Sequence, residues 1–358
     1  MNEQIKELTS EPSNYDFSTN HHNNVLFNVE NLSFGYNSSR KILDNFTTQF
    51  NEGEFAVIIG PNGCGKSTLI KSLVRVNIPD AGHIFFKDKL IYAPNPIEAV
   101  LLQLKYGLFK LWKKDVSQEL SSLQWFKANK SKYKVYGSKK LGAEISYVPQ
   151  ISNFPESTTI YEFVKMGRFP HSNALGINTN KKKEKEIIDG VLKQVGIYEF
   201  RNEDINGVSG GQRQKALIAM SLAQQTDTII LDEPTNHLDI KAQLEIMSLL
   251  HRLHHELHKS IILVIHDINV GIKYASTLFI MKDGKLLAKG KPKDIINSEI
   301  LLEAFGINAV VKTEDGGEIK ITEFSLPLSE ETVLEQQAQD SWNQHLEHHQ
   351  ELDSHSNK

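Results

Sequence analysis

The chain has 358 residues, of which 39% are hydrophobic and 23% are charged, and its formal net charge is −4. This composition predicts a globular protein with a sizeable core and excludes a largely disordered, collagen-like or disulfide-stapled chain. A single cysteine cannot form an internal disulfide, which suits a reducing compartment, and the near-neutral charge gives no reason to expect nucleic acid as a partner.

The first 24 residues are polar, follow no helix or strand period, and lack the basic-then-apolar pattern of a secretion signal. We therefore expect a disordered arm over residues 1–24 and no secretion. The richest apolar run, at 261–265, has only five residues. This is far short of the roughly 18 that span a bilayer.

Beyond the arm, strand patterns alternate with helix patterns, which predicts an α/β fold around a mixed or mostly parallel sheet. The predicted strands are two segments within 25–50, then 55–59, a strand near 83–86, 228–231, 261–265 and the β-rich stretch 277–288. The predicted helices are 65–76, 161–166, 183–195, 212–224, 241–257 and 270–274.

A glycine-rich loop lies between the strand 55–59 and the helix 65–76. It matches the pattern G-x-x-x-x-G-K-S, with the residues Gly60, Pro61, Asn62, Gly63, Cys64, Gly65, Lys66 and Ser67. In this context, backbone N–H groups and a helix N-terminus bind phosphate oxygens. We expect Lys66 to meet the β- and γ-phosphates of a nucleotide, Ser67 to ligate Mg²⁺ and Thr68 to support the α-phosphate. The alternative is a chance glycine-rich turn.

Two carboxylates end the apolar strand 228–231. Asp232 is placed to hold Mg²⁺ through water. Glu233, one residue further on, is placed to act as general base toward an attacking water. The alternative is that the two acids only cap the next helix or turn. The phosphate loop earlier in the chain makes this alternative less favoured, because a nucleotide bound there needs acidic groups nearby.

The segment VSGGQ at 208–212 opens a predicted helix. Ser209 suits an N-cap, and that is the simpler interpretation. The functional interpretation is that this helix N-terminus binds a second anion. Gly210, Gly211 and Gln212 would then allow close approach of a γ-phosphate.

The phosphate loop, VSGGQ, ILDEP at 230–234 and VIHD at 264–267 occur in the order found in ABC-type ATPases. Over about residues 25–323 the chain resembles this family, and it is most similar to the ATP-binding subunits of importers for iron–siderophore, haem and cobalamin complexes. The segments MGRFPH, LDIKAQLEIMSLL and VIHDINVGIKYAS carry that closer resemblance. It implies an ABC-type P-loop ATPase with a helical subdomain over about residues 151–210.

The resemblance implies roles for four further residues. Gln150 would sense Mg²⁺ and water and move with a membrane partner, and Asp239 would contact an opposite subunit. His266 would touch the γ-phosphate, and Tyr36 would stack on adenine. Taken alone, Tyr36 also fits an ordinary strand residue and His266 a structural histidine. Cys64 fits a small filler better than a redox switch.

The family pattern also implies how the chain assembles. Two copies would form a head-to-tail homodimer around two ATP molecules, so that Ser209 of one copy reaches the nucleotide held by Lys66 of the other. ATP and Mg²⁺ are the implied cofactors. Integral membrane permease subunits are the implied partners, with a coupling helix expected on the surface around 158–171, and a substrate-binding protein acts only indirectly. The chain is expected to lie on the cytoplasmic side of the membrane as a peripheral subunit.

Two segments depart from the family pattern. Residues 90–142 form an insertion in which 103–141 carry ten lysines against two acidic residues, a net charge of +8. Its helical spacing of apolar residues fits either a helix packed on the domain or an interfacial helix on anionic lipid. Residues 324–358 form a tail with seven acidic residues against one lysine, a net charge of −6. This tail fits either a solvated end or a loose transition-metal site, with the histidines His345, His348, His349 and His355.

We therefore expect an ATP-binding and ATP-hydrolysing subunit of an ABC importer, with iron–siderophore complexes as the leading substrate class. One alternative is the ATPase of a zinc or manganese importer, because a histidine-containing tail would suit a protein that handles such metal ions. A soluble ABC ATPase outside transport is another. A single nucleotide-binding set argues against translation factors, and the absence of long heptad repeats argues against DNA-maintenance ATPases.

Overall fold

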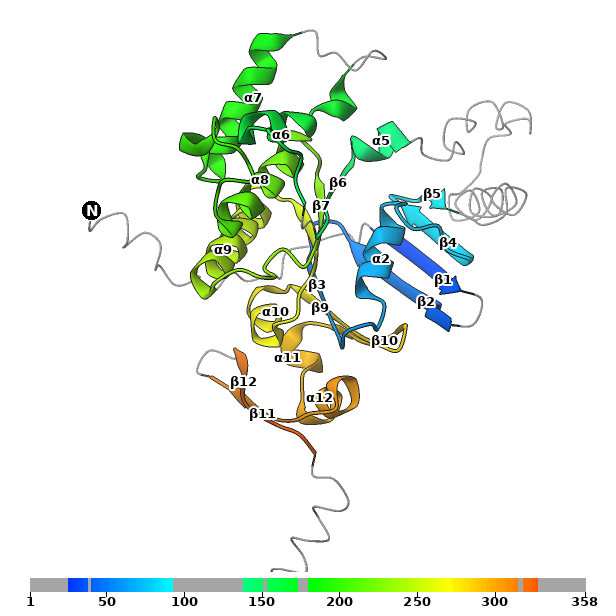
Figure 1. The fold of residues 1–358 in the computed structure, drawn as a ribbon. Helices are drawn as coiled ribbons and strands as arrows, with labels where there is room; N and C mark the ends of the chain where they lie inside the picture. Colours follow the sequence, from blue (N-terminus) through cyan, green and yellow to red (C-terminus); the bar gives the residue numbers. More distant parts are fainter. Residues whose placement is uncertain are drawn as a thin grey trace, which may run out of the picture.

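The computed structural model describes residues 25–37, 40–92, 138–150, 153–172, 180–314 and 318–327. The expected arm over 1–24 lies outside this part of the chain, as do residues 93–137 of the insertion and 328–358 of the tail. Two sheets meet at the centre, with the helices of residues 160–257 drawn to the left of them and those of residues 268–305 below (Figure 1). Within the described residues, no helix has both the length and the apolar character needed to cross a membrane.

A six-stranded sheet occupies the centre, in the strand order β10-β9-β3-β8-β7-β6. Its strands are β3 (Phe55–Ile59), β6 (Ile145–Val148), β7 (Thr228–Asp232), β8 (Ser260–Val264), β9 (Thr277–Lys282) and β10 (Lys285–Gly290). All pairs are parallel except β9 with β10. Strands β3, β7 and β8 are buried along their whole length, as parallel strands covered on both faces are. The predicted α/β fold with a mostly parallel sheet is confirmed.

Alternate residues of β3 show what covers each face of this sheet. Phe55, Val57 and Ile59 belong to a core shared with the helices α8, α9 and α10. Ala56 and Ile58 belong to a core shared with the second sheet and α2. These helices are α2 (Lys66–Leu73), α8 (Gly210–Ala223), α9 (Ile240–Leu257) and α10 (Ile268–Tyr274).

The second sheet is antiparallel, in the order β2-β1-β4-β5. Its strands are β1 (Val25–Asn37), β2 (Arg40–Asn51), β4 (Ala81–Phe86) and β5 (Lys89–Tyr92). Phe27 packs against Phe50 and Phe86, and Phe50 stacks on Phe279 of β9 with ring centroids 4.5 Å apart. These aromatic side chains therefore join the two sheets, since each ring buries a large apolar area.

A helical layer follows Gln150 in the chain. It consists of α6 (Ile160–Met166), the 3₁₀ turn η1 (Phe169–His171), α7 (Lys181–Gln194) and the 3₁₀ turn η2 (Tyr198–Phe200). Phe163, Ile188 and Leu217 of α6, α7 and α8 share one buried core. These elements occupy the stretch in which the sequence predicts a helical subdomain.

Several helices begin earlier than their apolar period predicts, because a side chain caps the first turn. Ser209 caps α8, Asp239 caps α9 and Asp267 caps α10. Helix α2 instead ends earlier than the predicted residue 76. It stops at Leu73, and Arg75 just beyond it has a φ of 61°, which lies outside the helical region.

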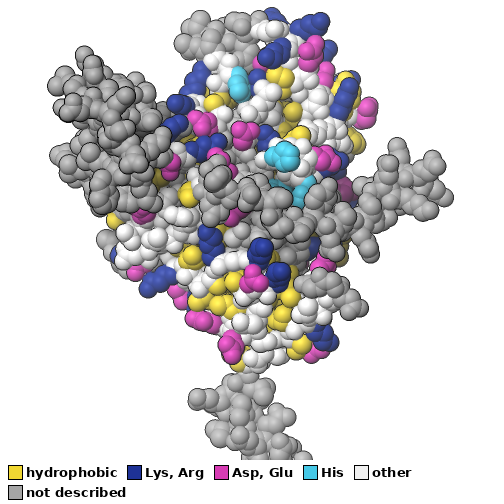
Figure 2. Space-filling model, turned by 180° about the vertical axis from the view of Figure 1, so that it is seen from behind, with side chains coloured by type: hydrophobic (Ala, Val, Ile, Leu, Met, Phe, Trp, Pro, Cys, Tyr) yellow, Lys and Arg dark blue, Asp and Glu magenta, His cyan; other side chains and the backbone are white. Residues whose placement is uncertain are grey.

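The C-terminal elements were not predicted. They are α11 (Pro292–Ile295), α12 (Ser298–Phe305), β11 (Asn308–Thr313) and β12 (Ile319–Ser325), and the short helix α5 (Ser138–Gly142) and strands β5 and β6 were also missed. Strand β12 continues past residue 323, where the sequence analysis ends the domain. Hydrophobic side chains gather at the lower end of the face drawn in Figure 2, the end of the molecule that carries the C-terminal elements in Figure 1.

Candidate nucleotide site

The phosphate loop joins β3 to α2, in the strand-to-helix context that the sequence predicts. Gly60 and Gly65 have φ values of 156° and 103°. A Cβ on Gly60 would lie 2.2 Å from Met281 O, and one on Gly65 would lie 2.9 Å from Ile42 O. Because only glycine fits at both positions, the loop stays tight at the N-terminus of α2, where backbone N–H groups lack partners within the helix.

The Lys66 side chain lies along this loop. Its Nζ donates hydrogen bonds to Gly60 O at 2.8 Å and to Pro61 O at 2.9 Å, and the residue is only 4% exposed. Thr68 is buried in the first turn of α2. An ammonium group held here at low exposure is well placed to neutralise phosphate charge, because charge-assisted contacts strengthen away from water.

Ser67 and Asp232 are in direct contact at the edge of the sheet where the strands end. Ser67 donates a hydrogen bond from Oγ to Asp232 Oδ1 at 2.8 Å, although the two residues are 165 positions apart. The contact joins the first turn of α2 to the end of β7. A hydroxyl and a carboxylate are hard oxygen donors of the kind that Mg²⁺ prefers, so this pair fits a magnesium ion.

Two residues that the sequence analysis did not single out also contact the Asp232 carboxylate. Tyr147 donates a hydrogen bond from Oη to Oδ2 at 3.4 Å, and Lys71 Nζ lies 3.9 Å from the same oxygen. Burial raises the pKa of Asp232, against the opposing effects of the Ser67 hydrogen bond and the Lys71 charge. Lys71 follows Ser67 by one helical turn, and this spacing could have indicated it.

Glu233 gathers three polar side chains around its carboxylate. His266 Nε2 lies 2.7 Å from Oε1, Gln150 Nε2 donates to Oε2 at 2.9 Å, and Asn236 Nδ2 donates to the same Oε2. The Glu233 backbone has a φ of 52°, a left-handed conformation uncommon outside glycine, which turns the chain directly after β7. The structure therefore brings Gln150, Glu233 and His266 together just beyond the ends of β6, β7 and β8.

Ser209 forms a reciprocal cap at the start of α8. Its Oγ accepts a hydrogen bond from Gln212 N at 3.3 Å, while Gln212 Oε1 accepts one from Ser209 N at 2.9 Å. This capping box agrees with the simpler interpretation of the segment. The next residue, Gly210, packs closely against the loop before α9, since a Cβ there would lie 3.3 Å from Leu238 Cδ2.

Asp239 lies beside this turn, at the start of α9. Its carboxylate accepts a hydrogen bond from Ala242 N at 2.8 Å, and a Cβ on Gly211 would lie 3.2 Å from Ala242 Cβ. Among the residues that the structure describes, no hydrogen bond or ion pair joins Ser209 or Asp239 to the phosphate loop. By their hydrogen bonds, the described candidate residues therefore fall into two sets, one around the phosphate loop and the acidic strand end and one at the starts of α8 and α9.

Tyr36 and Cys64 have different degrees of exposure. Tyr36 is 67% exposed, and its ring packs edge-on against Phe34 with centroids 5.0 Å apart, which leaves ring surface available for stacking on a base. Cys64 is buried, and burial raises the pKa of its thiol. A protonated, buried thiol agrees with the interpretation of Cys64 as a small filler.

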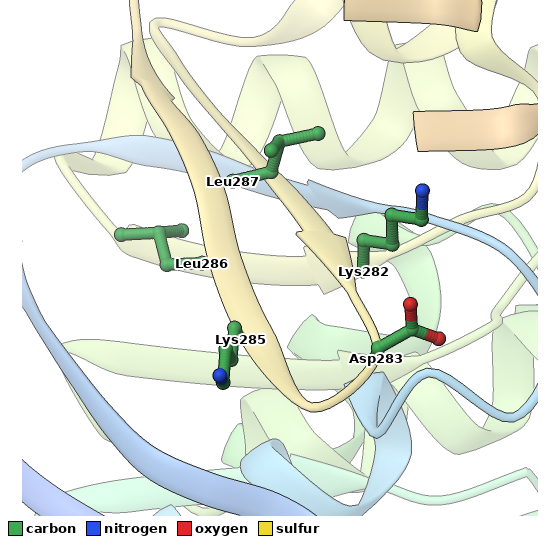
Figure 3. A pocket seen from close by; sticks show the side chains of 5 residues that line it. All are labelled: Lys282, Asp283, Lys285, Leu286 and Leu287. Carbon is green, nitrogen blue, oxygen red and sulfur yellow. The ribbon is translucent and has the colours of Figure 1, made fainter. Parts of the chain in front are cut away.

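The turn between β9 and β10 supports the phosphate loop from one side. Gly284 N donates to Cys64 O at 3.0 Å. A hollow of about 360 Å³ lies at this hairpin, lined by Lys282, Asp283, Lys285, Leu286 and Leu287 (Figure 3). It contains none of the phosphate-loop residues. The nucleotide site is therefore defined by the loop and the acidic strand end and not by this hollow.

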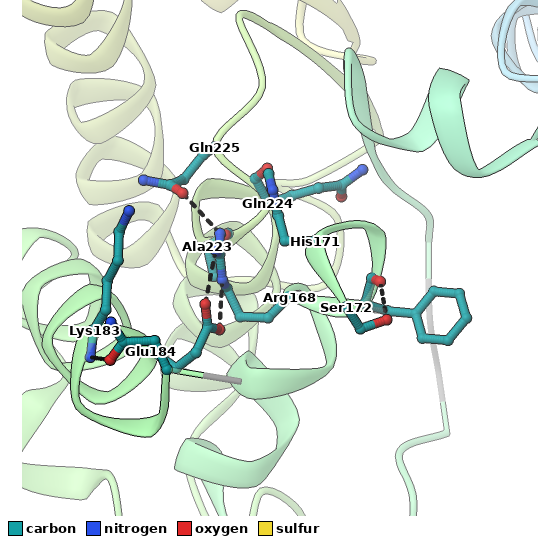
Figure 4. A network of polar contacts seen from close by, with 10 residues as sticks. Arg168, His171, Ser172, Lys183, Glu184, Ala223, Gln224 and Gln225 are labelled. Atoms are coloured by element: carbon teal, nitrogen blue, oxygen red, sulfur yellow. Dashed lines mark hydrogen bonds and ion pairs between the residues drawn. The ribbon is translucent and has the colours of Figure 1, made fainter. Parts of the chain in front are cut away.

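Arg168, in the MGRFPH segment, ties three helices together (Figure 4). Its Nε and Nη2 donate to the two Glu184 carboxylate oxygens at 2.8 and 3.0 Å. Its Nη1 donates to Ala223 O at 2.5 Å and to Gln225 Oε1 at 2.9 Å. The guanidinium thus connects the end of α6 to α7 and to the end of α8, which gives this arginine a structural role.

The parallel sheet, the phosphate loop between β3 and α2, and the acidic end of β7 define a P-loop nucleoside triphosphatase. The family model of the ABC transporter matches residues 43–236, and the chain belongs to this family. Its members of this type are ATP-binding proteins whose ATP hydrolysis drives transport, so the predictions of the family and of an ATPase are confirmed.

Known proteins similar to the chain agree with this assignment. It is 34% identical to the probable siderophore transport system ATP-binding protein YusV of Bacillus subtilis, over 80% of this chain and 88% of that protein. It is 31% identical to the petrobactin import ATP-binding protein FpuD of Bacillus anthracis, over 76% of this chain and 84% of that protein. A dimeric ATP-binding cassette with bound ADP and Pi matches with a TM-score of 0.56 and 25% identity, over 74% of this chain and 98% of that structure.

Proposed function

We propose that this chain is the ATP-hydrolysing subunit that energises an importer for iron–siderophore complexes. The observation that carries hydrolysis is the Glu233 carboxylate, oriented by Gln150 and His266 beside the Ser67–Asp232 pair. The substrate class is supported by relatives that are named for siderophore transport and petrobactin import and are 34% and 31% identical to this chain.

In the proposed reaction, Glu233 accepts a proton from water while the water oxygen attacks the γ-phosphorus. The bond from that phosphorus to the β–γ bridging oxygen breaks, which yields ADP and phosphate. Lys66 neutralises charge on the β- and γ-phosphates, and His266, beside Glu233, contacts the γ-phosphate. Mg²⁺, held by Ser67 and Asp232, would neutralise further phosphate charge when bound.

The separation of the two residue groups supports a homodimer. Ser209 and Asp239 lie together at the adjoining starts of α8 and α9, and among the described residues no hydrogen bond or ion pair joins them to the phosphate loop of their own chain. In a head-to-tail pair, Ser209, Gly210, Gly211 and Gln212 would close on the nucleotide held by Lys66 of the second copy. The similar solved cassette is dimeric with ADP and Pi bound. Tyr36, with its exposed ring, would stack on the adenine.

The surface around 158–171 is the proposed docking site for the permease. Met166 is 49% exposed and Phe169 is 66% exposed, and they present apolar side chains that a coupling helix from a permease can cover. Gln150 would then report permease movement to Glu233. We place the chain on the cytoplasmic side of the membrane, with a substrate-binding protein acting only through the permease.

An uptake assay tests this proposal. Cells that lack this chain are complemented with wild type or with Glu233→Gln, and uptake of a radiolabelled ferric siderophore is measured. We expect wild type to restore uptake and Glu233→Gln not to restore it. If wild type restores zinc or manganese uptake instead, the substrate class is wrong. If the chain co-purifies with ribosomes or DNA and with no permease, the importer role is wrong.

A further inference from the structure

The last turns of α9 carry three histidines, none of which the nucleotide site uses, and two of them form a pair. His251 and His255 are four residues apart and therefore lie on one face of the helix. Their Nε2 atoms share a hydrogen bond of 3.0 Å, in whose place a metal ion could bind both nitrogens, and their ring centroids are 4.2 Å apart. His255 is exposed and His251 is half-buried, so solvent reaches the pair. Figure 2 shows histidine side chains (cyan) at the surface of one face of the molecule.

We propose that His251 and His255 form a binding site for a divalent transition metal such as Zn²⁺ or Cu²⁺. Imidazole nitrogens bind zinc at about 2.0–2.1 Å, so two neighbouring ligands of one ion lie roughly 2.9–3.4 Å apart. The observed separation of 3.0 Å falls in that range. Two histidines separated by one helical turn also supply the metal ligands of H-E-x-x-H sites.

The surroundings hold the His251 ring in place. It packs edge-on against Tyr274 of α10, with centroids 5.6 Å apart. The adjacent His254 does not belong to the proposed metal site. Its Nδ1 is hydrogen-bonded to Lys259 O at 2.9 Å, and its ring packs on Phe55. The site is therefore a chelate of two residues, one of which is already fixed by packing.

The chemistry of the pair favours borderline transition metals over Mg²⁺ and Ca²⁺, which take oxygen ligands. Within the described residues, no group of three or more His, Cys, Asp or Glu side chains could hold a metal. Water or an exchangeable ligand therefore fills the remaining positions on the ion.

Calorimetric titration and thermal unfolding test the site. The sample is untagged full-length protein without nucleotide, in which the four tail histidines are replaced by glutamine so that they cannot compete for metal. We expect Zn²⁺ to bind and to raise the melting temperature, because the ion binds the paired histidines of the folded helix more tightly than the separate histidines of the unfolded chain. His255→Gln, at an exposed position, should weaken Zn²⁺ binding by at least about tenfold and abolish the rise.

His258→Asn is the matched control, because His258 is exposed at the end of the same helix and its φ of 50° is one that asparagine adopts readily. It should leave Zn²⁺ affinity and the melting-temperature rise unchanged. His251→Gln should reproduce the loss seen with His255→Gln. The proposal is overturned if the background protein does not bind Zn²⁺, if His255→Gln binds it equally well, or if His258→Asn loses as much affinity.

Discussion

His266 Nε2 lies 2.7 Å from Glu233 Oε1, although the two residues follow different strands. Strands β7 and β8 pair in parallel, with Asp232 opposite Val264, so the residues just beyond each strand emerge at the same edge of the sheet. Gln150, two residues beyond β6, reaches the other oxygen of the same carboxylate. The residues that follow three neighbouring strands therefore meet, and Gln150 and His266 fix the orientation of the Glu233 carboxylate.

Glu233→Gln should retain ATP binding while the rate of hydrolysis falls by about 10²–10⁴-fold, because the amide cannot accept the proton of the attacking water. Phosphate release measures the rate and calorimetry measures ATP affinity. Glu245→Gln is the control, since Glu245 pairs with Lys215 on the surface and should leave the rate unchanged. Near-normal turnover of Glu233→Gln would remove this residue from the mechanism.

Lys66→Ala should weaken ATP binding by roughly 10- to 100-fold, because a hydrogen bond to a charged group contributes about 1.5–3 kcal/mol. Calorimetric titration with ATP measures the change. Lys193→Ala removes a lysine from the exposed face of α7 and serves as the matched charge control. Unchanged ATP affinity in Lys66→Ala would contradict the phosphate-loop interpretation.

Tyr147→Phe should raise the Mg²⁺ concentration needed for half-maximal ATPase activity by several-fold, with little change in the rate at saturating Mg²⁺. The variant keeps the ring but removes the hydroxyl that donates to Asp232 at 3.4 Å, so this carboxylate loses one of the donors that orient it. A Mg²⁺ titration of activity provides the measurement. Tyr161→Phe, in α6 away from Asp232, is the control. An unchanged Mg²⁺ requirement in Tyr147→Phe would show that the contact does not position Asp232.

Arg168→Ala should lower the free energy of unfolding by about 3–5 kcal/mol, because it removes a buried guanidinium that binds both Glu184 carboxylate oxygens and the end of α8. Arg168→Lys should recover only part of this loss, since lysine lacks the planar fork that binds both oxygens. Urea denaturation measures both. Arg201→Ala, which removes a guanidinium stacked on Tyr198, is the control. If Arg168→Ala loses no more free energy of unfolding than Arg201→Ala, the Arg168 contacts do not hold these helices together.

Thr159→Ala should destabilise the protein by about 1 kcal/mol at pH 7, the usual effect of removing an N-cap side chain. The backbone N–H and the hydroxyl of Thr159 hold the pKa of Glu162 below its ordinary value of 4.5. The stabilisation from Glu162 is therefore present above pH 4.5 and is lost as the pH falls through the lowered pKa.

The stability difference between wild type and Thr159→Ala should accordingly narrow when urea denaturation is repeated below pH 4.5. Thr313→Ala, at the exposed end of β11, is the control and should show no such pH dependence. A difference that stays constant over this range would show that the hydroxyl does not act through Glu162.

Much of the fold could be predicted because it depends on residues close together in the chain. The continuous apolar run of β3, the glycine loop and the amphipathic period of α9 each carry their own signal. The C-terminal hairpin had no such signal. Its position depends on Asn269 of α10, whose side-chain amide exchanges two hydrogen bonds with the backbone of Ile321 in β12. Neither the sequence around Asn269 nor the sequence around Ile321 indicates this contact.

The sequence alone determined the class of chemistry, since a phosphate loop between a strand and a helix and a pair of acids after a second strand are local patterns. The tertiary structure decided which side chains act together. Gln150 and Glu233 are 83 residues apart, and Ser67 and Asp232 are 165 apart, so strand order and parallel register place them within hydrogen-bond distance. The fold also places the Ser209 turn beside the start of α9, where Gly210 lies close to Leu238 and Gly211 close to Ala242, a contact between segments that are about thirty residues apart.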